Sequence, residues 1–420
     1  MRRPDYNRRI AVTGLGAITP LGNDVDTVWR NLVSGTSGLG PITRFDASGY
    51  ESNVAGEVKG FDAREWMDFK AARRTGLNVQ FGVAAAKQAL ADSGIQVTPE
   101  NRDEIGIVFA SGAGEPKLMM DNKQIWDTKG ARLVSPFFIA NMLVDTASGQ
   151  IAIETGIRGH NMAVVTACST GTHSIGEASE AIRRGDCIAV IAGSTESPIY
   201  EMVWVGFGSM RGIGTPRPGE PIQTVSRPFD LTRNGFILGE GAAALMLEDL
   251  EVAKARGARI YAEVVGYGST NDAWDLIQPI AGGDGVARAM QLALERRGVP
   301  ADEIDMINPH GTSTTLGDLA EAQAIHRVFG ERAGEIAISA TKSMTGHMMG
   351  AAGSFEGLAT VLSVYHQMVP PTINYRDPDP EIQLDVSPVA RPRRIRYALS
   401  ENVGLGGHNG ALIFKRYEGN

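Results

Sequence analysis

The chain has 420 residues, of which 43% are hydrophobic and 6% aromatic, and its 51 glycines are spread along the whole length. This composition is typical of a globular α/β protein with two or three domains, and the net charge of −8 excludes a general affinity for nucleic acids. The two cysteines, Cys168 and Cys187, exclude a disulfide scaffold and a CxxC metal site, and they favour a reducing, cytoplasmic setting.

Short β-branched runs in the first half of the chain predict buried strands at residues 9–13, 105–110, 162–166 and 188–192. Apolar positions with a period near 3.6 predict helices at residues 77–93 and 175–184, which end before Gly94 and Gly185. The basic residues before the first strand are not followed by an apolar stretch long enough for a signal peptide or a membrane span, so we expect neither.

The same alternation restarts after about residue 257. Strands are predicted at residues 261–265, 304–308 and 336–339, and helices at residues 285–297, 319–329 and around 360–367. The chain therefore consists of two tandem α/β halves, residues 1–257 and 258–420, joined near residues 254–259. The similarity between the halves is too weak to establish an internal repeat from the residues alone.

The first chemical motif is T-A-C-S-T-G at residues 166–171, which follows a predicted strand and opens a predicted helix. Free N–H groups and the dipole at a helix N-terminus favour a thiolate, so we expect Cys168 to be a nucleophile with a lowered pKa. The alternative is that Cys168 is a small buried core residue. Cys187 lies at a helix-to-strand turn without this context, and we expect it to be structural.

Two further motifs place histidines and a lysine after strand ends. The sequence N-P-H-G-T-S-T at residues 308–314 contains His310, and S-A-T-K-S-M-T-G-H-M-M-G-A-A-G at residues 339–353 contains Lys342 and His347. Strand ends are where α/β sheets carry their sites, so these residues and Cys168 predict one site. Their spacing by itself does not name a reaction.

Two glycine motifs resemble phosphate-binding loops only superficially. Gly14 and Gly16 follow a strand, but the third glycine and the acidic strand end of a dinucleotide turn are missing. The stretch G-L-G-G-H-N-G at residues 404–410 lacks the Lys-Ser/Thr of a P-loop. We expect the second stretch to bring its backbone close to another group.

Together with R-P-F-D at residues 227–230, G-F-I-L-G-E-G-A at 235–242 and P-P-T-I-N at 370–374, these motifs resemble the elongating β-ketoacyl-[acyl-carrier-protein] synthases of type II fatty-acid synthesis. The resemblance runs from about Arg9 to Lys415. It implies an α/β protein with the thiolase-like five-layer αβαβα sandwich, and a homodimer. Thiolases carry a second cysteine where Gly406, Gly407 and His408 stand here, and initiating synthases carry an asparagine in place of His347.

The resemblance also implies a decarboxylative Claisen condensation without a metal or redox cofactor. Cys168 takes the acyl chain, the backbone N–H groups of Cys168 and Leu405 form the oxyanion hole, and His310 and His347 stabilise the enolate of a malonyl-acyl-carrier protein. Further implied roles are an ion pair of Lys342 with Glu356, contacts of the pantetheine arm with Thr312 and Thr314, an acyl pocket at Ala113 and Ile277, and docking of the acidic carrier protein on Lys70, Arg73, Arg74, Arg132 and Arg211.

Several residues depart from the family pattern. Val403 and Leu405 replace two phenylalanines of the glycine loop, and Leu405 holds the position of the gate. Asp275 and Ile277 replace a histidine and a threonine near the pocket entrance, Pro309 replaces an alanine, and Leu133 replaces a docking lysine. Phe207 and Ile277 are candidates to fill the space of the missing gate ring. Two alternatives therefore stay open: a ketosynthase of a specialised polyketide or unusual fatty-acid pathway, and a non-extending partner subunit, against which Cys168 argues.

Overall fold

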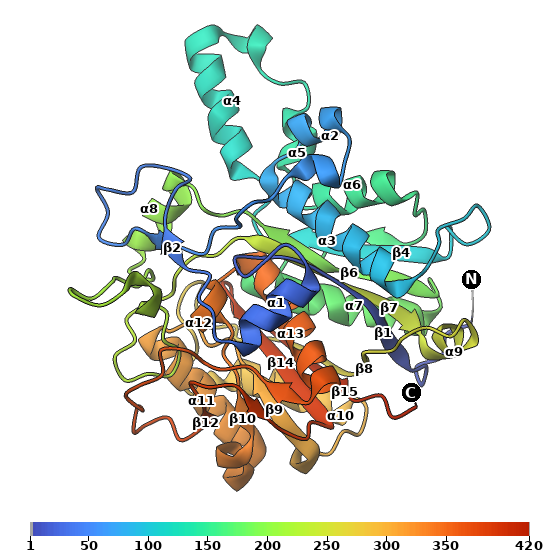
Figure 1. Ribbon diagram of the computed structural model, residues 1–420, viewed down its shortest axis with the longest axis vertical. Coiled ribbons are helices and arrows are strands. Elements are labelled where there is room, and N and C mark those ends of the chain that lie inside the picture. The colour runs from blue at the N-terminus through green and yellow to red at the C-terminus, as the bar shows by residue number, and fades with distance from the viewer. Residues whose placement is uncertain (1–2, 420) are drawn as a thin grey trace.

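The computed structural model describes residues 3–419, and within them one mixed sheet of eleven strands runs through the molecule (Figure 1). Its strand order is β12-β10-β9-β14-β15-β8-β1-β7-β6-β4-β5. The strands are β1 Ile10–Ile18, β4 Ile105–Ser111, β5 Asn161–Met162, β6 Ala189–Glu196, β7 Gly241–Asp249, β8 Ala262–Asn271, β9 Ile304–Asn308, β10 Ala337–Ile338, β12 Asp385–Val386, β14 Tyr397–Gly404 and β15 His408–Lys415. Two short ribbons pair β2 Gly40–Pro41 with β3 Val54–Ala55 and β11 Met368–Val369 with β13 Arg391–Pro392.

The topology shows the internal repeat that the residues alone could not establish. In the first half, β5, β4 and β6 are parallel neighbours, and β7 and β1 continue the sheet in antiparallel fashion. In the second half, β10, β9 and β14 are parallel, and β15 and β8 continue in the same antiparallel way. The halves meet where residues 10–12 of β1 pair with residues 262–264 of β8.

Helices cover the outer faces of the two halves of the sheet and fill the space between the two halves. Helices α3 and α6 pack on the strands of the first half, and α10 contacts β8 and β15 of the second half. Helices α7 and α13 pack against each other and contact strands of both halves, which gives the predicted αβαβα order of layers (Figure 1). The helices are α1 Val25–Val33, α2 Phe69–Arg74, α3 Leu77–Ser93, α4 Pro116–Lys129, α5 Phe138–Met142, α6 Thr146–Thr155, α7 Thr170–Arg184, α8 Glu201–Ser209, α9 Leu250–Ala255, α10 Asp284–Glu295, α11 Thr315–Phe329, α12 Lys342–Thr345 and α13 Ala352–His366.

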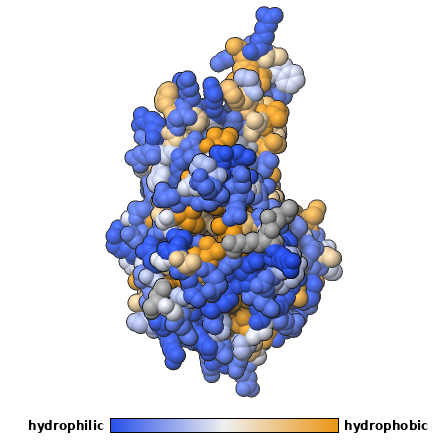
Figure 2. All heavy atoms as spheres, turned by 90° about the vertical axis from the view of Figure 1, so that its right-hand side faces the viewer, coloured by the Kyte–Doolittle hydropathy of each residue, from blue (hydrophilic) through white to orange (hydrophobic). Residues whose placement is uncertain are grey.

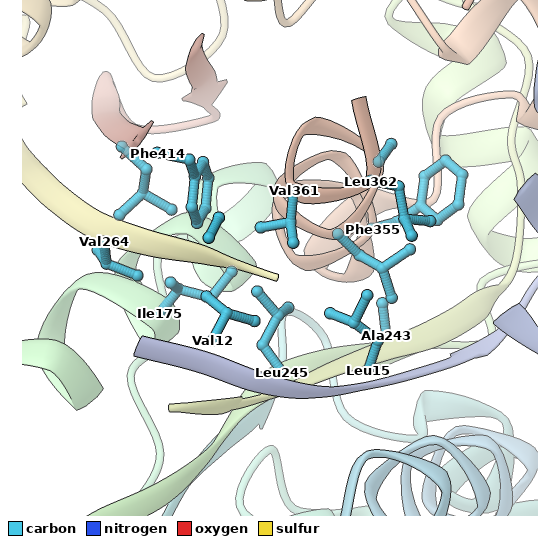
Figure 3. Close-up of a cluster of buried hydrophobic side chains, with 14 of the residues drawn as sticks. Val12, Leu15, Ile175, Ala243, Leu245, Val264, Phe355, Val361, Leu362 and Phe414 are labelled. Atoms are coloured by element: carbon cyan, nitrogen blue, oxygen red, sulfur yellow. The ribbon is translucent and has the colours of Figure 1, made fainter. Parts of the chain in front are cut away.

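The largest hydrophobic cluster lies around the central helix layer. Phe355, Val361 and Leu362 of α13 face apolar side chains of β1 and β7, among them Leu15 and Leu245 (Figure 3). Burying such side chains contributes roughly 1.5–3 kcal/mol each, so this interface holds α13 firmly against the sheet. The segments that lead into the N-termini of α7 and α13 are therefore fixed in position, and these segments carry Cys168 and His347.

Local signals located several elements well. Helix α3 and strand β9 have the predicted bounds, and Gly94 ends α3 with a φ of 73°. The predicted strand at residues 162–166 is wrong in length, because β5 covers only Asn161–Met162. Beyond it the chain turns toward α7, and the backbone N–H of Thr166 is taken by the Thr170 hydroxyl at 3.0 Å instead of by a strand. Gly14 and Gly16 lie inside β1 and not in a turn after it, and an added Cβ at either position would lie about 2 Å from the backbone of α3.

Strands β7, β14 and β15 were not predicted from the sequence. They lie inside the sheet and are almost wholly buried, so the alternation of apolar and polar residues that marks an exposed strand is absent. No helix in residues 3–419 is both long enough and apolar enough to cross a bilayer.

Candidate active site

Cys168 lies in a turn that connects β5 to the central helix α7. A short 3-10 helix, Ala167–Ser169, leads directly into α7, and Ala167 has a φ of 51°, an unusual conformation for alanine. The thiol is buried, and the backbone N–H groups of Leu405 and of Cys168 itself both approach it. Gly404 allows this approach, because a Cβ there would lie 2.5 Å from the carbonyl oxygen of Thr166. The site thus has two backbone donors that converge on the thiol.

The expected lowering of the pKa of Cys168 is wrong for this structure. Burial raises the pKa of the thiol to about 11, although Lys342 and the two backbone N–H groups act in the opposite direction. The position at the helix N-terminus is as predicted, but removal of water from the sulfur has the larger effect. Cys168 is consequently a neutral thiol at rest, and its proton must leave as a substrate binds.

His310 follows the end of β9 in a loop whose backbone is held by two carboxyl groups. The N–H groups of His310 and Gly311 both donate to Glu321, and the N–H of His310 also approaches Glu401 at 3.2 Å. Burial and the contact with Glu401 raise the pKa of Glu321 well above its usual range. Burial raises the pKa of Glu401 as well. The two carboxyl groups accept the backbone N–H groups of the His310 loop and so fix its position.

His347 lies beside His310, and the two rings are nearly perpendicular, with centroids 5.1 Å apart. The backbone N–H of His347 donates to Ile237 O at 2.6 Å, which anchors the residue just before α13. The pKa values of both histidines lie well below the usual 6.5, because burial and the nearby charge of Lys342 oppose protonation. Both rings are therefore neutral and each can donate one N–H hydrogen bond.

Lys342 and Glu356 form the predicted ion pair, and both side chains are almost completely buried. Burial raises the pKa of Glu356 to about 7, whereas Lys342 and Asn402 act to lower it. A buried pair of this kind is costly to break, because either partner alone would be an uncompensated buried charge. Lys342 begins α12 and Glu356 lies in α13, so the ion pair also ties these two helices together.

One cavity of about 340 Å³ connects the catalytic residues with the surface. Cys168, His310 and His347 line its inner part, and Thr312 and Thr314 line it as well, with their hydroxyl oxygens 3.1 Å apart. The first cavity is also lined by six other residues that the sequence analysis singled out: Phe207, Arg211, Asp275, Ile277, Val403 and Leu405. The structure therefore brings together every predicted catalytic side chain except Lys342, which lies behind the histidines.

A second cavity of about 270 Å³ lies next to the first and contains Ala113. Phe207, Met349 and Leu405 line both cavities, so these side chains separate them. The predicted acyl pocket at Ala113 and Ile277 stays a prediction, and the two residues line neighbouring cavities that share three side chains. Ile277 belongs to the first cavity and is 52% exposed, because its loop faces the solvent, whereas Ala113 lies beyond the separating side chains.

The five predicted docking residues are all exposed and come from three segments. Lys70, Arg73 and Arg74 belong to α2, and Arg132 lies in the 3-10 helix Ala131–Leu133. Arg211 follows α8 and lines the first cavity. Of the five, only Arg211 is placed at the cavity itself.

Sequence reasoning missed several polar residues around the site. Glu321, Glu401 and Asn402 contact His310, and Glu196 accepts hydrogen bonds from the backbone of Gly112 and Gly350 beside the second cavity. Carboxylates and amides are common at surfaces, and of these residues only Glu321 lies in a predicted element, so their positions give no local signal. Only E-N directly before the glycine loop, at residues 401–402, could have drawn attention, because two polar residues end an apolar strand there.

The position of Leu405 between the cavities leads to a prediction about access to Cys168. A leucine cannot cover the thiol with a flat ring, so we expect faster alkylation of Cys168 here than in a Leu405→Phe variant, by roughly tenfold. The measurement is the rate of Cys168 modification by iodoacetamide, followed by intact mass. The backbone donor of Leu405 does not depend on its side chain, and condensation should persist in the variant.

An equal alkylation rate and equal acyl selectivity in Leu405→Phe would contradict an open gate. It would indicate that Phe207, which lines both cavities, already closes the passage.

Comparisons with known proteins agree with this arrangement. The sequence model of the β-ketoacyl synthase N-terminal domain matches residues 7–253, and that of the C-terminal domain matches residues 261–376. The chain is 45% identical over 414 residues to 3-oxoacyl-[acyl-carrier-protein] synthase 2 of Staphylococcus aureus (strain COL), covering 98% of this chain and 99% of the relative. It is 45% identical over 412 residues to the protein of the same name from Vibrio cholerae serotype O1, with 97% and 99% covered.

Solved structures show the same fold. The ishigamide ketosynthase/chain length factor superposes with a TM-score of 0.89 at 35% identity, covering 98% of this chain and 99% of that chain. A ketosynthase solved with its type II polyketide acyl-carrier protein gives 0.89 at 31% identity, with 99% and 100% covered. A β-ketoacyl synthase from Burkholderia phymatum STM815 gives 0.89 at 33% identity, with 98% and 100% covered.

A thiolase-like fold whose central helix presents a buried cysteine to two neutral histidines defines a condensing enzyme. The matches to both domain models and to relatives along nearly their full length identify the family within this class of enzymes. The chain belongs to the β-ketoacyl synthase family, and its activity is that of a condensing acyltransferase.

Proposed function

We propose that this protein elongates acyl chains bound to an acyl carrier protein, with Cys168 as the acylated nucleophile. The observation that carries the proposal is one cavity in which a buried thiol, two neutral imidazoles and two backbone N–H groups converge. In the first step the Cys168 sulfur attacks the acyl thioester and loses its proton. The carrier thiol leaves and takes up a proton, and the acyl group stays on Cys168.

In the second step a malonyl-acyl-carrier protein enters the first cavity. The bond between its terminal carboxylate and the adjacent carbon breaks, CO₂ leaves, and the electron pair forms an enolate on the thioester. His310 and His347 donate hydrogen bonds to the enolate oxygen, and each such donor contributes on the order of 3 kcal/mol to the transition state. The enolate carbon then attacks the acyl group, a new carbon–carbon bond forms, and the Cys168 thiolate leaves and is reprotonated.

The neutral state of both histidines fits this role. A neutral imidazole donates a hydrogen bond without losing its proton to the enolate, and burial, together with the charge of Lys342, keeps both rings neutral. The backbone N–H groups of Cys168 and Leu405 support the other oxyanion, which forms on the acyl thioester. Thr312 and Thr314 line this cavity, and in this proposal their hydroxyl groups bind the pantetheine arm.

Intact-mass analysis tests the proposal directly. Incubation with acyl carrier proteins that bear chains of different length should add the acyl mass to Cys168, and malonyl-acyl-carrier protein should then yield a 3-oxoacyl product two carbons longer. Absence of both products, with folded protein and loaded carriers, would overturn the proposal. The length profile would also separate elongation in primary fatty-acid synthesis from a specialised ketosynthase. That second candidate is favoured by the likeness to two polyketide-type ketosynthases.

Docking of the carrier protein at the mouth of the first cavity gives a prediction for Arg211. We expect Arg211→Glu to raise the KM for carrier-bound substrates roughly tenfold, because an acidic partner would meet a like charge, and to flatten the salt dependence of the rate. Steady-state kinetics with malonyl-acyl-carrier protein at several salt concentrations measures both effects.

The matched control is Lys254→Glu in α9, which directly follows β7 and lines neither cavity. Short pantetheine thioesters form a second control, because they do not dock through a carrier protein. A similar loss with pantetheine thioesters, or with Lys254→Glu, would refute docking as the role of Arg211.

A homodimer is part of the proposal. Ala113 lines the second cavity and yet is exposed in the isolated chain, so this cavity lacks a wall on that side. Exposed apolar side chains lie nearby on the projecting segment around α4 and α5, and apolar atoms gather at this end of the molecule in Figure 2. They are Met119, Met120, Trp126, Leu133, Phe137, Ile139 and Leu143. A second copy of the chain that covers this segment would close the second cavity.

We further propose that the enzyme acts in the cytoplasm.

The size of the residue at Ala113 should set the longest acyl chain. A phenylalanine there would fill part of the second cavity and remove room for about three methylene groups, each of which contributes about 0.8 kcal/mol when buried. We therefore expect Ala113→Phe to shorten the longest chain found on Cys168 by intact mass, with short chains loaded normally. An unchanged length profile would show that the chain does not enter this cavity.

A further inference from the structure

The side chain of Asn402 lies between a proposed catalytic histidine and the buried ion pair. Asn402 is completely buried near the end of β14, three residues before Leu405. Its amide nitrogen is 3.2 Å from Nδ1 of His310 and 2.7 Å from Oε2 of Glu356. Its amide oxygen accepts a hydrogen bond from the Thr172 hydroxyl, one turn into α7. The amide therefore connects His310, Glu356 of the buried ion pair, and α7.

These three contacts fix the orientation of the amide. If the amide were flipped, its oxygen would face the Glu356 carboxylate, and the Thr172 hydroxyl would lose its acceptor. Glu356 is itself paired with Lys342 through its other oxygen, so Oε2 is available to accept. The Asn402 nitrogen thus presents one hydrogen to Glu356 and the other to Nδ1 of His310, and all its hydrogen-bonding groups are used.

A donor facing Nδ1 determines where His310 carries its proton. A neutral imidazole has one N–H, and a nitrogen that accepts a hydrogen bond cannot be the protonated one. We propose that Asn402 is a positioning residue that holds His310 in the tautomer with the proton on Nε2. This inference rests on the proposed function, because only then does the Nε2–H of His310 meet the enolate oxygen. The Lys342–Glu356 pair acts on His310 through Asn402.

The substitution Asn402→Asp should reverse this tautomer with little change of shape. An aspartic acid carries at most one proton, and it would donate this proton to Oε2 of Glu356. The aspartic acid would then have no second hydrogen for Nδ1 of His310 and would present a hydrogen-bond acceptor there. The ring proton of His310 would therefore move from Nε2 to Nδ1. The Nε2 atom would become an acceptor, unable to donate to the enolate. We expect malonyl decarboxylation to fall roughly a hundredfold or more, whereas acyl loading of Cys168 stays within about threefold of the native rate.

The position of the proton can be observed without any turnover. In protein labelled with ¹⁵N-histidine, the Nδ1 and Nε2 shifts of a neutral ring differ by tautomer, and a His310→Gln sample identifies the His310 signal among the seven histidines. Magic-angle-spinning spectra should show an unprotonated Nδ1 for His310 in the native protein and a protonated Nδ1 in Asn402→Asp. A protonated Nδ1 in the native protein would overturn the inference.

A second pair of variants keeps the test decisive if Asn402→Asp does not fold. Thr172→Val removes the hydroxyl that orients the amide, and Thr172→Ser retains it. We expect Thr172→Val to lower decarboxylation roughly tenfold more than loading, and Thr172→Ser to behave as the native enzyme. Equal losses of loading and decarboxylation would show a merely structural role for Asn402. If the native protein neither loads acyl groups nor decarboxylates malonyl carriers, the proposed function fails, and the spectra alone then decide the tautomer.

Discussion

Replacement of Cys168 by alanine is expected to abolish acyl transfer, with a loss on the order of 10⁴-fold or more, because no other group in the cavity can form the thioester intermediate. Intact mass after incubation with an acyl-carrier protein should show no acyl addition to the variant. Malonyl decarboxylation should persist, because His310 and His347 still line the first cavity when the thiol has been removed. The result would show that acyl transfer requires the Cys168 sulfur and that malonyl decarboxylation does not.

Cys187→Ala is the matched control for this experiment. Cys187 is buried at the turn before β6, and burial raises the pKa of its thiol to about 12. We expect this variant to be acylated as the native protein is, with a loss of stability of no more than about 1–3 kcal/mol from the lost packing. An acyl group mapped by peptide mass spectrometry to Cys187 would show that the nucleophile has been assigned incorrectly.

Alanine at His310 or at His347 is expected to lower malonyl decarboxylation by roughly 10²–10³-fold for each donor that is removed from the enolate. Acyl loading should continue in both variants, because the oxyanion of that step faces the backbone N–H groups near Cys168. Release of CO₂ from malonyl-acyl-carrier protein and acyl addition by intact mass measure the two steps separately.

His326→Ala supplies the control, since His326 lies in the last turn of α11 and does not line either cavity. It should leave both half-reactions at the native level. Normal decarboxylation in both His310→Ala and His347→Ala would refute the assignment, whereas an equal loss of loading would indicate a collapsed site.

The outlines of the fold could be predicted wherever a signal is local. The end of α3 at Gly94 and the strand β9 were placed correctly, because a helix stop and a β-branched run act within a few residues. Strand β7 was missed, because its A-A-A-L-M-L run is buried on both faces and shows no strand periodicity. The repeat of strand order in the two halves also depends on pairings between distant segments, which no local pattern records.

The sequence by itself predicted which residues react. Cys168, His310, Lys342 and His347 stand in motifs that follow predicted strands, and in the structure the thiol and both imidazoles line one cavity. Their roles in the reaction stay predictions. The family resemblance drawn from these motifs is likewise confirmed by the matched domain models.

Only the tertiary structure decided the pKa values, the surroundings and the hydrogen-bond partners of these residues. Burial raises the pKa of the Cys168 thiol although its helix position suggested the opposite, and Ala113 and Ile277 line two neighbouring cavities. The orientation of His310 depends on Asn402, which lies 92 residues away in the sequence. Desolvation and hydrogen-bond partners arise from segments brought together by the sheet, and a sequence pattern reports only the few residues on either side of a position.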